Sequence, residues 1–272
     1  MNILEEIVIH KRKEVELGKL AKPISLLQKT DFFDRKTFSI KHFLKKPDSC
    51  GIIAEFKRKS PSKGIINDKA KVDHVTSLYA EAGVSALSIL TDNQFFGGSN
   101  NDLTKGREMN SIPVLRKDFI IDEYQIFEAK AIGADVILLI AAILTPEQVK
   151  NFATLAHSLG LEVLLEVHDR NELELTLTPE VDLVGVNNRN LKDFSVSINT
   201  SLDLAHFIPD DFIKISESGI SDPNLILTLK QAGFRGFLIG ENFMQNPDPG
   251  SSCKAFVEEL RRIEKKSVKV TK

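Results

Sequence analysis

Cysteine is scarce in this chain of 272 residues, which contains only Cys50 and Cys253. Two cysteines are too few for a disulfide framework or a zinc site, and the histidines show no metal-ligand spacing. We therefore expect no metal ion in the protein. A reducing cytoplasm is the location that this cysteine usage predicts.

Long apolar runs and a strong net charge are absent as well. No stretch approaches the roughly 20 apolar residues of a membrane-spanning helix, and the charged residues 1–16 do not resemble a signal peptide. The formal net charge is −2, which argues against nucleic acid or an anionic membrane as the main partner. We expect a monomer that binds a small molecule, with no nucleic acid or membrane partner.

Short β-branched runs alternate with amphipathic stretches after residue 50. The predicted strands are 51–56, 85–90, 112–119, 135–140, 161–167, 181–187, 211–218 and 236–240. Thr145-Pro146 and Asp222-Pro223 are typical of a helix N-cap followed by proline in the first turn. Strands that alternate with helices indicate right-handed βαβ units and a parallel sheet.

Eight such units in roughly 220 residues predict an α/β fold of the closed (β/α)8 barrel type, also called a TIM barrel. The alternative is an open doubly wound sheet, which usually has a glycine-rich dinucleotide turn after its first strand, and EFKRKSPSKG is not such a turn. We divide the chain into a helical N-terminal extension packed on the barrel (1–50), the barrel (51–265) and a frayed basic tail (266–272).

Polar side chains follow the apolar runs at the strand ends, where barrel enzymes carry out their chemistry. Side chains alternate along a strand, so Glu55 and Lys57 face the same way. The later strand ends hold Lys117 with Phe119, Glu166, Asn187 with Arg189, and Ser216 with Ser218. Two carboxylates and two ammonium groups in one cup would shift one another's pKa values, as acid–base catalysis requires. A purely structural layer of Lys–Glu ion pairs is the alternative.

The last two strands carry a second signal. Gly219 and Gly240 come just after them, at the usual phosphate site of such a barrel, where glycine lets the backbone approach an anion. Ser60 could donate a hydroxyl from the loop after the first strand. The pairing of the two glycines predicts a phosphorylated ligand.

Six stretches of the chain, in order, resemble the indole-3-glycerol phosphate synthase family: IIAEFKRKSPSKG, VLRKDF, LLEVHD, GVNNRNL, SESGI and FLIGENFM. The match runs from about residue 50 to 248, and a helical N-terminal extension is also typical of that family. The resemblance implies the closure of the indole ring in tryptophan biosynthesis. In that reaction 1-(2-carboxyphenylamino)-1-deoxyribulose 5-phosphate gives indole-3-glycerol phosphate, CO2 and water.

By motif position, the resemblance implies roles for specific residues. It implies catalytic roles for Glu55, Lys57, Lys117, Glu166, Asn187 and Ser218. It implies phosphate contacts at Ser60, Gly219, Gly240 and the backbone of Glu241, and contacts with the anthranilate ring at Phe96, Phe119 and Leu138. Arg189 matches the Asn-x-Arg pattern of the family. Glu241 stands where some members have serine, and a hydroxyl contact there would require this carboxylate to point away.

The implied chemistry needs no cofactor, because loss of CO2 restores the aromatic ring. Lys117 can act as the general acid of ring closure. Lys57 can act as the acid of the later dehydration, with Glu55 or Glu166 as its base. Two alternatives remain: a sister barrel isomerase of the phosphoribosylanthranilate isomerase type, and a nonenzymatic barrel that binds a phosphorylated ligand.

Two further features have structural interpretations. His168 has the opposite parity to Glu166, so we predict that it lies on the surface or in a loop. Residues 95–102 lack the consecutive Lys and Ser/Thr of a P-loop, and we predict a mobile loop there that closes over the substrate.

Overall fold

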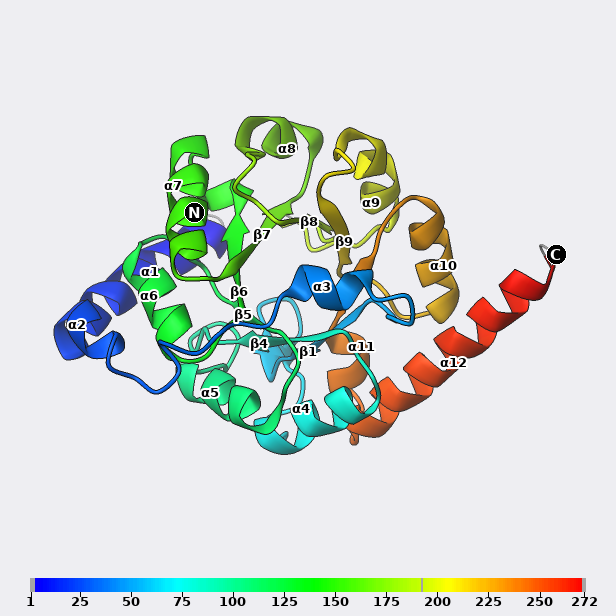
Figure 1. The fold of residues 1–272 in the computed structure, drawn as a ribbon, viewed down its shortest axis with the longest axis horizontal. Helices are drawn as coiled ribbons and strands as arrows, with labels where there is room; N and C mark the ends of the chain where they lie inside the picture. The colour runs from blue at the N-terminus through cyan, green and yellow to red at the C-terminus, as the bar shows by residue number, and fades with distance from the viewer. Residues whose placement is uncertain (1–2, 192, 271–272) are drawn as a thin grey trace.

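The structure, a computed structural model, describes residues 3–191 and 193–270. Eight parallel strands close into a barrel in the order β1-β10-β9-β8-β7-β6-β5-β4 (Figure 1), which confirms the predicted fold class. The strands are β1 (Ile52–Phe56), β4 (Ala86–Leu90), β5 (Val114–Lys117), β6 (Val136–Ile140), β7 (Glu162–Val167), β8 (Leu183–Asn187), β9 (Ile213–Glu217) and β10 (Gly236–Ile239).

The strands are buried on both faces, which is why their sequences are almost continuously apolar. Ile53, Leu115 and Leu164 belong to one apolar cluster, which fills the interior of the barrel. Ile52 and Val163, one position away in sequence, belong to a second cluster that joins the barrel to its helices. This alternation decides which side chains reach the mouth of the barrel.

Helices follow the strands and surround the barrel (Figure 1). They are α4 (Val72–Glu81), α5 (Asn100–Met109), α6 (Tyr124–Ala131), α7 (Pro146–Ser158), α8 (Arg170–Thr176), α9 (Asn199–Leu204), α10 (Pro223–Gln231), α11 (Glu241–Met244) and α12 (Pro249–Val270). Short 3-10 helices form at η1 (Ala141–Ile143) and η2 (Ala205–Phe207). Thr145 and Asp222 cap α7 and α10 with their side chains, as predicted.

The N-terminal segment contacts the barrel at both ends. At the mouth, the buried ammonium of Lys11 in α1 (Ile3–Ala21) pairs with Asp92 and Asp118 at 3.0 and 2.9 Å. Next, α2 (Ile24–Leu27) packs against α6. At the base, α3 (Ile40–Lys45) crosses the barrel (Figure 1), and its N-cap Ser39 donates to Glu162, the first residue of β7, at 2.6 Å.

The chain after the barrel remains helical. α12 packs on α4, α10 and α11, and its last turns project away from the barrel (Figure 1). Residues 266–270, which we assigned to the tail, therefore continue α12, and residues 271–272 lie outside the described residues. Within the described ranges, none of the helices has the length and apolar character needed to cross a membrane.

Two local elements depart from the predicted pattern. A small antiparallel hairpin of β2 (Lys59–Ser60) and β3 (Gly64–Ile65) follows β1. The segment 95–102 is not one loop, because Ser99 caps α5 and residues 100–102 form its first turn. Arg58 makes two hydrogen bonds to Asp102, at 2.8 and 2.9 Å, and so ties the loop after β1 to α5.

Candidate active site

One cavity at the mouth of the barrel brings together nearly all of the predicted site residues. It is lined by Glu55, Lys57, Ser60, Phe96, Lys117, Phe119, Leu138, Glu166, Asn187, Arg189, Ser218 and Glu241. Gly219 and Gly240 line an adjoining cavity, which shares Lys57, Arg189 and Glu241 with the first. Residues from all eight barrel strands or the loops after them thus meet in one place, as the barrel topology requires.

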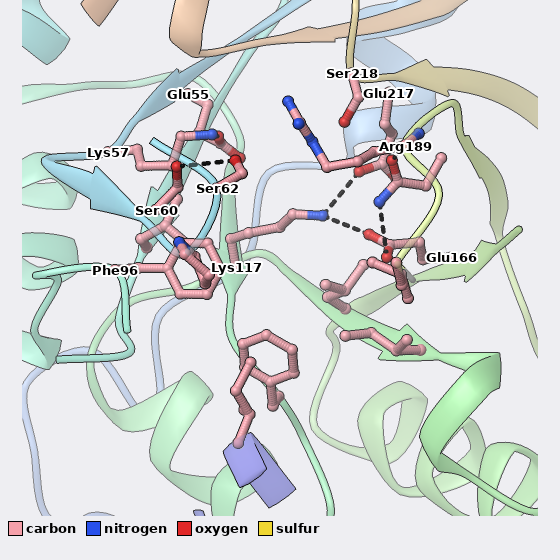
Figure 2. Close-up of a pocket in the computed structure, with 18 of the residues that line it drawn as sticks. Glu55, Lys57, Ser60, Ser62, Phe96, Lys117, Glu166, Arg189, Glu217 and Ser218 are labelled. Atoms are coloured by element: carbon pink, nitrogen blue, oxygen red, sulfur yellow. Dashed lines mark hydrogen bonds and ion pairs between the residues drawn. The ribbon is translucent and has the colours of Figure 1, made fainter. Parts of the chain in front are cut away.

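The ammonium of Lys117 lies at the centre of this cavity, between two carboxylates (Figure 2). Its Nζ is 2.7 Å from Glu166 Oε2 and 2.8 Å from Glu217 Oε2. The three residues come from β5, β7 and β9, and all three side chains are largely buried. Lys117 is therefore held as a cation within hydrogen-bonding distance of two acids.

The two carboxyl groups have opposite pKa shifts. Burial acts to raise the pKa of Glu166, but the charges of Lys117 and His168 and the hydrogen bonds from Lys117 and Asn187 outweigh it and lower that pKa. Burial raises the pKa of Glu217 well above its usual value, because Lys117 opposes this effect only in part and Glu166 adds to it. Glu166 is thus the ionised member of the pair and Glu217 the member that holds a proton more readily.

A second ion pair lies beside the first. Lys57 Nζ is 2.8 Å from Glu55 Oε1, on the face that the strand parity predicted (Figure 2). An added Cβ at Gly240 would come within 2.6 Å of the same Glu55 oxygen. Gly240 therefore makes room for the Glu55 carboxylate, in addition to lining the adjoining cavity.

Asn187 and Arg189 lie between the carboxylate of Glu166 and the edge of the cavity. Asn187 Nδ2 donates to Glu166 Oε1 at 3.2 Å, and Asn187 Oδ1 accepts from the backbone N–H of Arg189 at 3.0 Å. The Arg189 guanidinium extends toward Glu241, with Nη2 3.4 Å from Oε2. Asn187 therefore helps to orient Glu166, while Arg189 presents a cation at the edge of the cavity.

Apolar side chains form the opposite wall. The rings of Phe96 and Phe119 lie with their centroids 5.8 Å apart, next to Leu138. Ile3, Leu4 and Ile7 of α1 also line this cavity, which sequence reasoning missed. The sequence pattern that could have revealed this contribution is the i, i+4 spacing of Ile3, Ile7 and Lys11, which places all three on one face of the helix. The N-terminal helix therefore contributes to the ring-sized apolar part of the cavity.

The adjoining cavity carries the predicted phosphate-binding features. Gly219, with φ of 78°, and Gly240, directly before α11, both line it, together with Lys63. The Glu241 side chain does not point away: its carboxylate lines both cavities, 3.4 Å from Arg189 and 3.7 Å from Lys63. A negative charge therefore stands beside the two cations of this region.

Glu217 is the main residue that sequence reasoning missed. The prediction that Ser216 faces the mouth is wrong, because its hydroxyl bonds to Asn188 and Ser201 on the helix side of the barrel. Ser218 does line the cavity, but only because its backbone turns into the left-handed region, with φ of 68°. The inward parity of Ile213 and Ile215 was the signal for Glu217, the next residue in that series.

The prediction for His168 is correct for the loop, because the residue lies in the bend between β7 and α8, but wrong for the surface. The imidazole is not on the surface: its side chain is 13% exposed, and its Nε2 lies 3.5 Å from Glu166 Oε1. It lines a neighbouring cavity with Asp169 and Glu172, and Asn187 and Arg189 line both cavities. The parity argument placed it correctly outside the barrel interior but overlooked how closely it approaches Glu166.

The matching family model and the curated relatives described here point to the same family. The family described as indole-3-glycerol phosphate synthase matches residues 4–256. An indole-3-glycerol phosphate synthase of Bacteroides thetaiotaomicron is 49% identical over 260 residues, which cover 96% of this chain and 99% of that protein. One of Thermoanaerobacter pseudethanolicus is 42% identical over 259 residues, covering 95% and 98%.

Solved structures are similar in fold at low sequence identity. The alpha subunit of tryptophan synthase from Legionella pneumophila superimposes with a TM-score of 0.61 at 13% identity, over 82% of this chain and 97% of that one. The 3-hexulose-6-phosphate synthase of Salmonella typhimurium gives 0.62 at 12% identity, over 78% and 99%. These likenesses show the barrel fold alone.

Proposed function

The chain belongs to the indole-3-glycerol phosphate synthase family, and from this premise we propose that Lys117, Glu166 and Glu217 carry out the acid–base steps of its reaction. The chain is a carbon–carbon lyase of tryptophan biosynthesis. It converts 1-(2-carboxyphenylamino)-1-deoxyribulose 5-phosphate to indole-3-glycerol phosphate, CO2 and water. The observation that carries the residue assignment is the position of Lys117 Nζ between two carboxylates of opposite pKa shift.

The first step is ring closure. The ring carbon that bears the carboxylate attacks the ketone carbon, and the ketone oxygen becomes a hydroxyl as it takes a proton from Lys117. The ammonium also stabilises the negative charge that develops on this oxygen. Glu217, 2.8 Å from Lys117 and able to hold a proton near neutral pH, then returns a proton to the lysine.

Loss of CO2 follows, and the electron pair of the broken carbon–carbon bond restores the aromatic ring. No electron sink is required for this step. Lys57, 2.8 Å from Glu55, holds the substrate carboxylate before it leaves, because an ammonium at the rim is the natural partner of that anion. The apolar wall of Phe96, Phe119 and Leu138 holds the anthranilate ring.

Dehydration completes the reaction. Lys57 protonates the new hydroxyl, which leaves as water, while the ring nitrogen takes on positive charge. Glu166, held ionised, stabilises this charge, and Glu217 accepts the proton from the adjacent carbon, because its raised pKa makes it the better base of the two. This division of roles differs from the sequence prediction, in which Glu55 or Glu166 was the base.

The phosphate lies in the adjoining cavity, against Gly219, Gly240 and the backbone of Glu241, and Ser60 of the first cavity donates its hydroxyl from the side where the two cavities meet. Support comes from the two glycines that line this cavity and from Lys63 and Arg189 at its edge. Asn187 and Ser218 take substrate hydroxyls. A monomeric state and a cytoplasmic location remain predictions from the sequence, and light scattering of the purified protein tests the first.

The decisive experiment follows indole fluorescence with the carboxyphenylamino deoxyribulose phosphate as substrate. Lys117→Met keeps the side-chain length and removes the proton and the charge. We expect kcat to fall at least about a hundredfold with a much smaller change in KM, since the ring and phosphate contacts lie elsewhere. Lys130→Met is the matched control, because this buried ammonium donates to the backbone of Arg35 away from the site.

Normal turnover in Lys117→Met, together with a much lower melting temperature, would instead make the Lys–Glu cluster a structural ion-pair layer. The sister-isomerase alternative predicts rearrangement of phosphoribosylanthranilate without release of CO2, so a carbon dioxide assay separates the two. A nonenzymatic phosphate-binding barrel predicts neither product.

A further inference from the structure

His168 joins the catalytic carboxylates to a third carboxylate behind them. Its Nε2 lies 3.5 Å from Glu166 Oε1, and its Nδ1 lies 3.1 Å from Glu172 Oε2. The imidazole does not line the cavity that holds Lys117 and the apolar wall. It lines a neighbouring cavity, and the residue of the catalytic cavity with which it pairs is Glu166, so we expect His168 to act on the reaction chiefly through that carboxylate.

The start of α8 fixes the imidazole in this position. Asp169 caps the helix, because its Oδ1 accepts a hydrogen bond from the backbone N–H of Glu172 at 2.9 Å. The Glu172 carboxylate in turn accepts a hydrogen bond from the backbone N–H of His168 at 2.8 Å. The same carboxylate oxygen also faces His168 Nδ1. With Nδ1 held by Glu172, the other nitrogen is directed at Glu166. The rigid first turn of a helix, rather than a loop, therefore sets the orientation of the ring.

The surroundings favour a charged imidazole. Glu166 of β7 and Glu172 of α8 face its two nitrogens, and Glu217 of β9 contributes a more distant carboxylate. Asp169 and Arg189 line the same cavity. Burial opposes the imidazolium, but the hydrogen bond to Glu172 and the charges of Glu166, Glu172 and Glu217 outweigh it and raise the pKa of His168.

We propose that His168 is a positioning residue that, as an imidazolium anchored by Glu172, holds Glu166 in place and keeps it ionised during the reaction. This inference rests on the proposed role of Glu166. Negative and positive charges then alternate from Glu172 through His168 and Glu166 to Lys117. Glu217 lies at the end of this series, next to Lys117. With Glu166 fixed as an anion from both sides, the exchangeable proton of the acid pair resides on Glu217, where the proposed proton transfers need it.

Removal of the imidazolium should change the pH dependence in a defined direction. An opposite charge within about 4–6 Å lowers the pKa of a carboxyl group by roughly 1–3 units. Without it, the pKa of Glu166 rises toward that of Glu217, and Glu166 is protonated at a higher pH. The acid limb of the kcat profile then moves upward, while substrate contacts, and hence KM, change little.

The test measures kcat and KM from about pH 4 to about pH 9 for His168→Asn, His168→Lys and Glu172→Gln. We expect His168→Asn to move the acid limb up by about one pH unit and to lower kcat about tenfold at its acid end. His168→Lys, which restores a cation, should recover the wild-type profile, and Glu172→Gln should shift the limb in the same direction as His168→Asn. His157→Asn is the control, because His157 pairs with Asp182 near the base of the barrel, 2.8 Å away.

An unchanged pH profile in His168→Asn overturns the proposal, even if the melting temperature falls. If His168→Asn does not fold, an unchanged profile in Glu172→Gln overturns it equally. Glu166→Gln separates this inference from the function on which it rests. Normal turnover in Glu166→Gln contradicts the role of Glu166 itself, whereas an inactive Glu166→Gln beside an unchanged His168→Asn profile contradicts only the role of His168.

Discussion

Gly185 of β8 faces the carboxylate of Glu217 on β9 so closely that a Cβ at position 185 would come within 2.2 Å of Glu217 Oε1. The backbone of Gly185 does not adopt positive φ, so alanine meets no backbone strain there. The constraint at this position is therefore the space that the buried carboxylate occupies. A glycine in the middle of a barrel strand makes room for the buried Glu217 carboxylate on the next strand.

Gly185→Ala should displace Glu217 from Lys117. We expect kcat to fall by about tenfold or more and stability to fall by about 1–3 kcal/mol, the usual range for an overpacked interior. Kinetics and thermal unfolding check the two effects. A double-mutant cycle with Glu217→Ala isolates the clash, because removing the carboxylate relieves it. Additive losses of stability in the double variant would mean that the two positions do not compete for space.

Lys57→Met should affect a later step than Lys117→Met. If Lys57 protonates the hydroxyl during dehydration, a decarboxylated but still hydrated intermediate should accumulate, and KM should rise through loss of the carboxylate contact. Rapid quenching followed by mass spectrometry detects this species. The control is Lys59→Met, because the Lys59 ammonium contacts the backbone oxygen of Gln94 and does not line the cavity. Product formation without a detectable intermediate would argue for a role before decarboxylation.

The sequence predicts the barrel and most of the mouth because both depend on strand parity and turn signals. The eight strands lie within two residues of their predicted bounds, since buried parallel strands form short apolar runs between clear turns. Inward parity also carries Glu55, Lys117, Glu166 and Asn187 to the cavity. These assignments need only local periodicity and the rule that barrel chemistry lies at the strand ends.

The missed residues depend on information that a single strand does not contain. Ser218 reaches the cavity through a left-handed backbone, so counting alternate positions backward from it assigned Ser216 in place of Glu217. The contribution of Ile3, Leu4 and Ile7 requires knowing that Lys11 binds Asp92 and Asp118 across the mouth. His168 approaches Glu166 because the α8 cap turns it back. Each is a tertiary contact between segments far apart in sequence or joined by a special turn.

Glu217 should also leave a signature in the pH dependence of stability. Burial, with Glu166 adding to the effect, raises its pKa from the ordinary value of 4.5 to about 7. Between these values the folded state holds the proton more often than the unfolded state, so this contribution to stability is present below pH 4.5 and is lost as the pH rises toward 7.

Thermal unfolding of the wild type and Glu217→Gln across this range measures the effect. Gln cannot titrate, so the stability of the wild type relative to the variant should fall between pH 5 and 7 and then level off. A difference that stays constant from about pH 5 to 8 would show that Glu217 titrates at its ordinary value in the folded protein.

Glu241 provides the test of the phosphate site. Its carboxylate lies 3.4 Å from Arg189 and 3.7 Å from Lys63, at the edge of the cavity that Gly219 and Gly240 line. A bound phosphate would face this negative charge and would share the two cations with it.

Glu241→Ser removes the charge and releases both cations, so inorganic phosphate should inhibit several-fold more strongly and KM should fall, most clearly at low ionic strength. Glu259→Ser, which removes an equal charge paired with Arg262 on α12, is the control and should change neither quantity. If inhibition by phosphate is the same in Glu241→Ser and the wild type at low salt, the phosphate does not bind beside Glu241. The adjoining cavity would then not be the phosphate site, because no anion could occupy it without interacting with that carboxylate and its two cations.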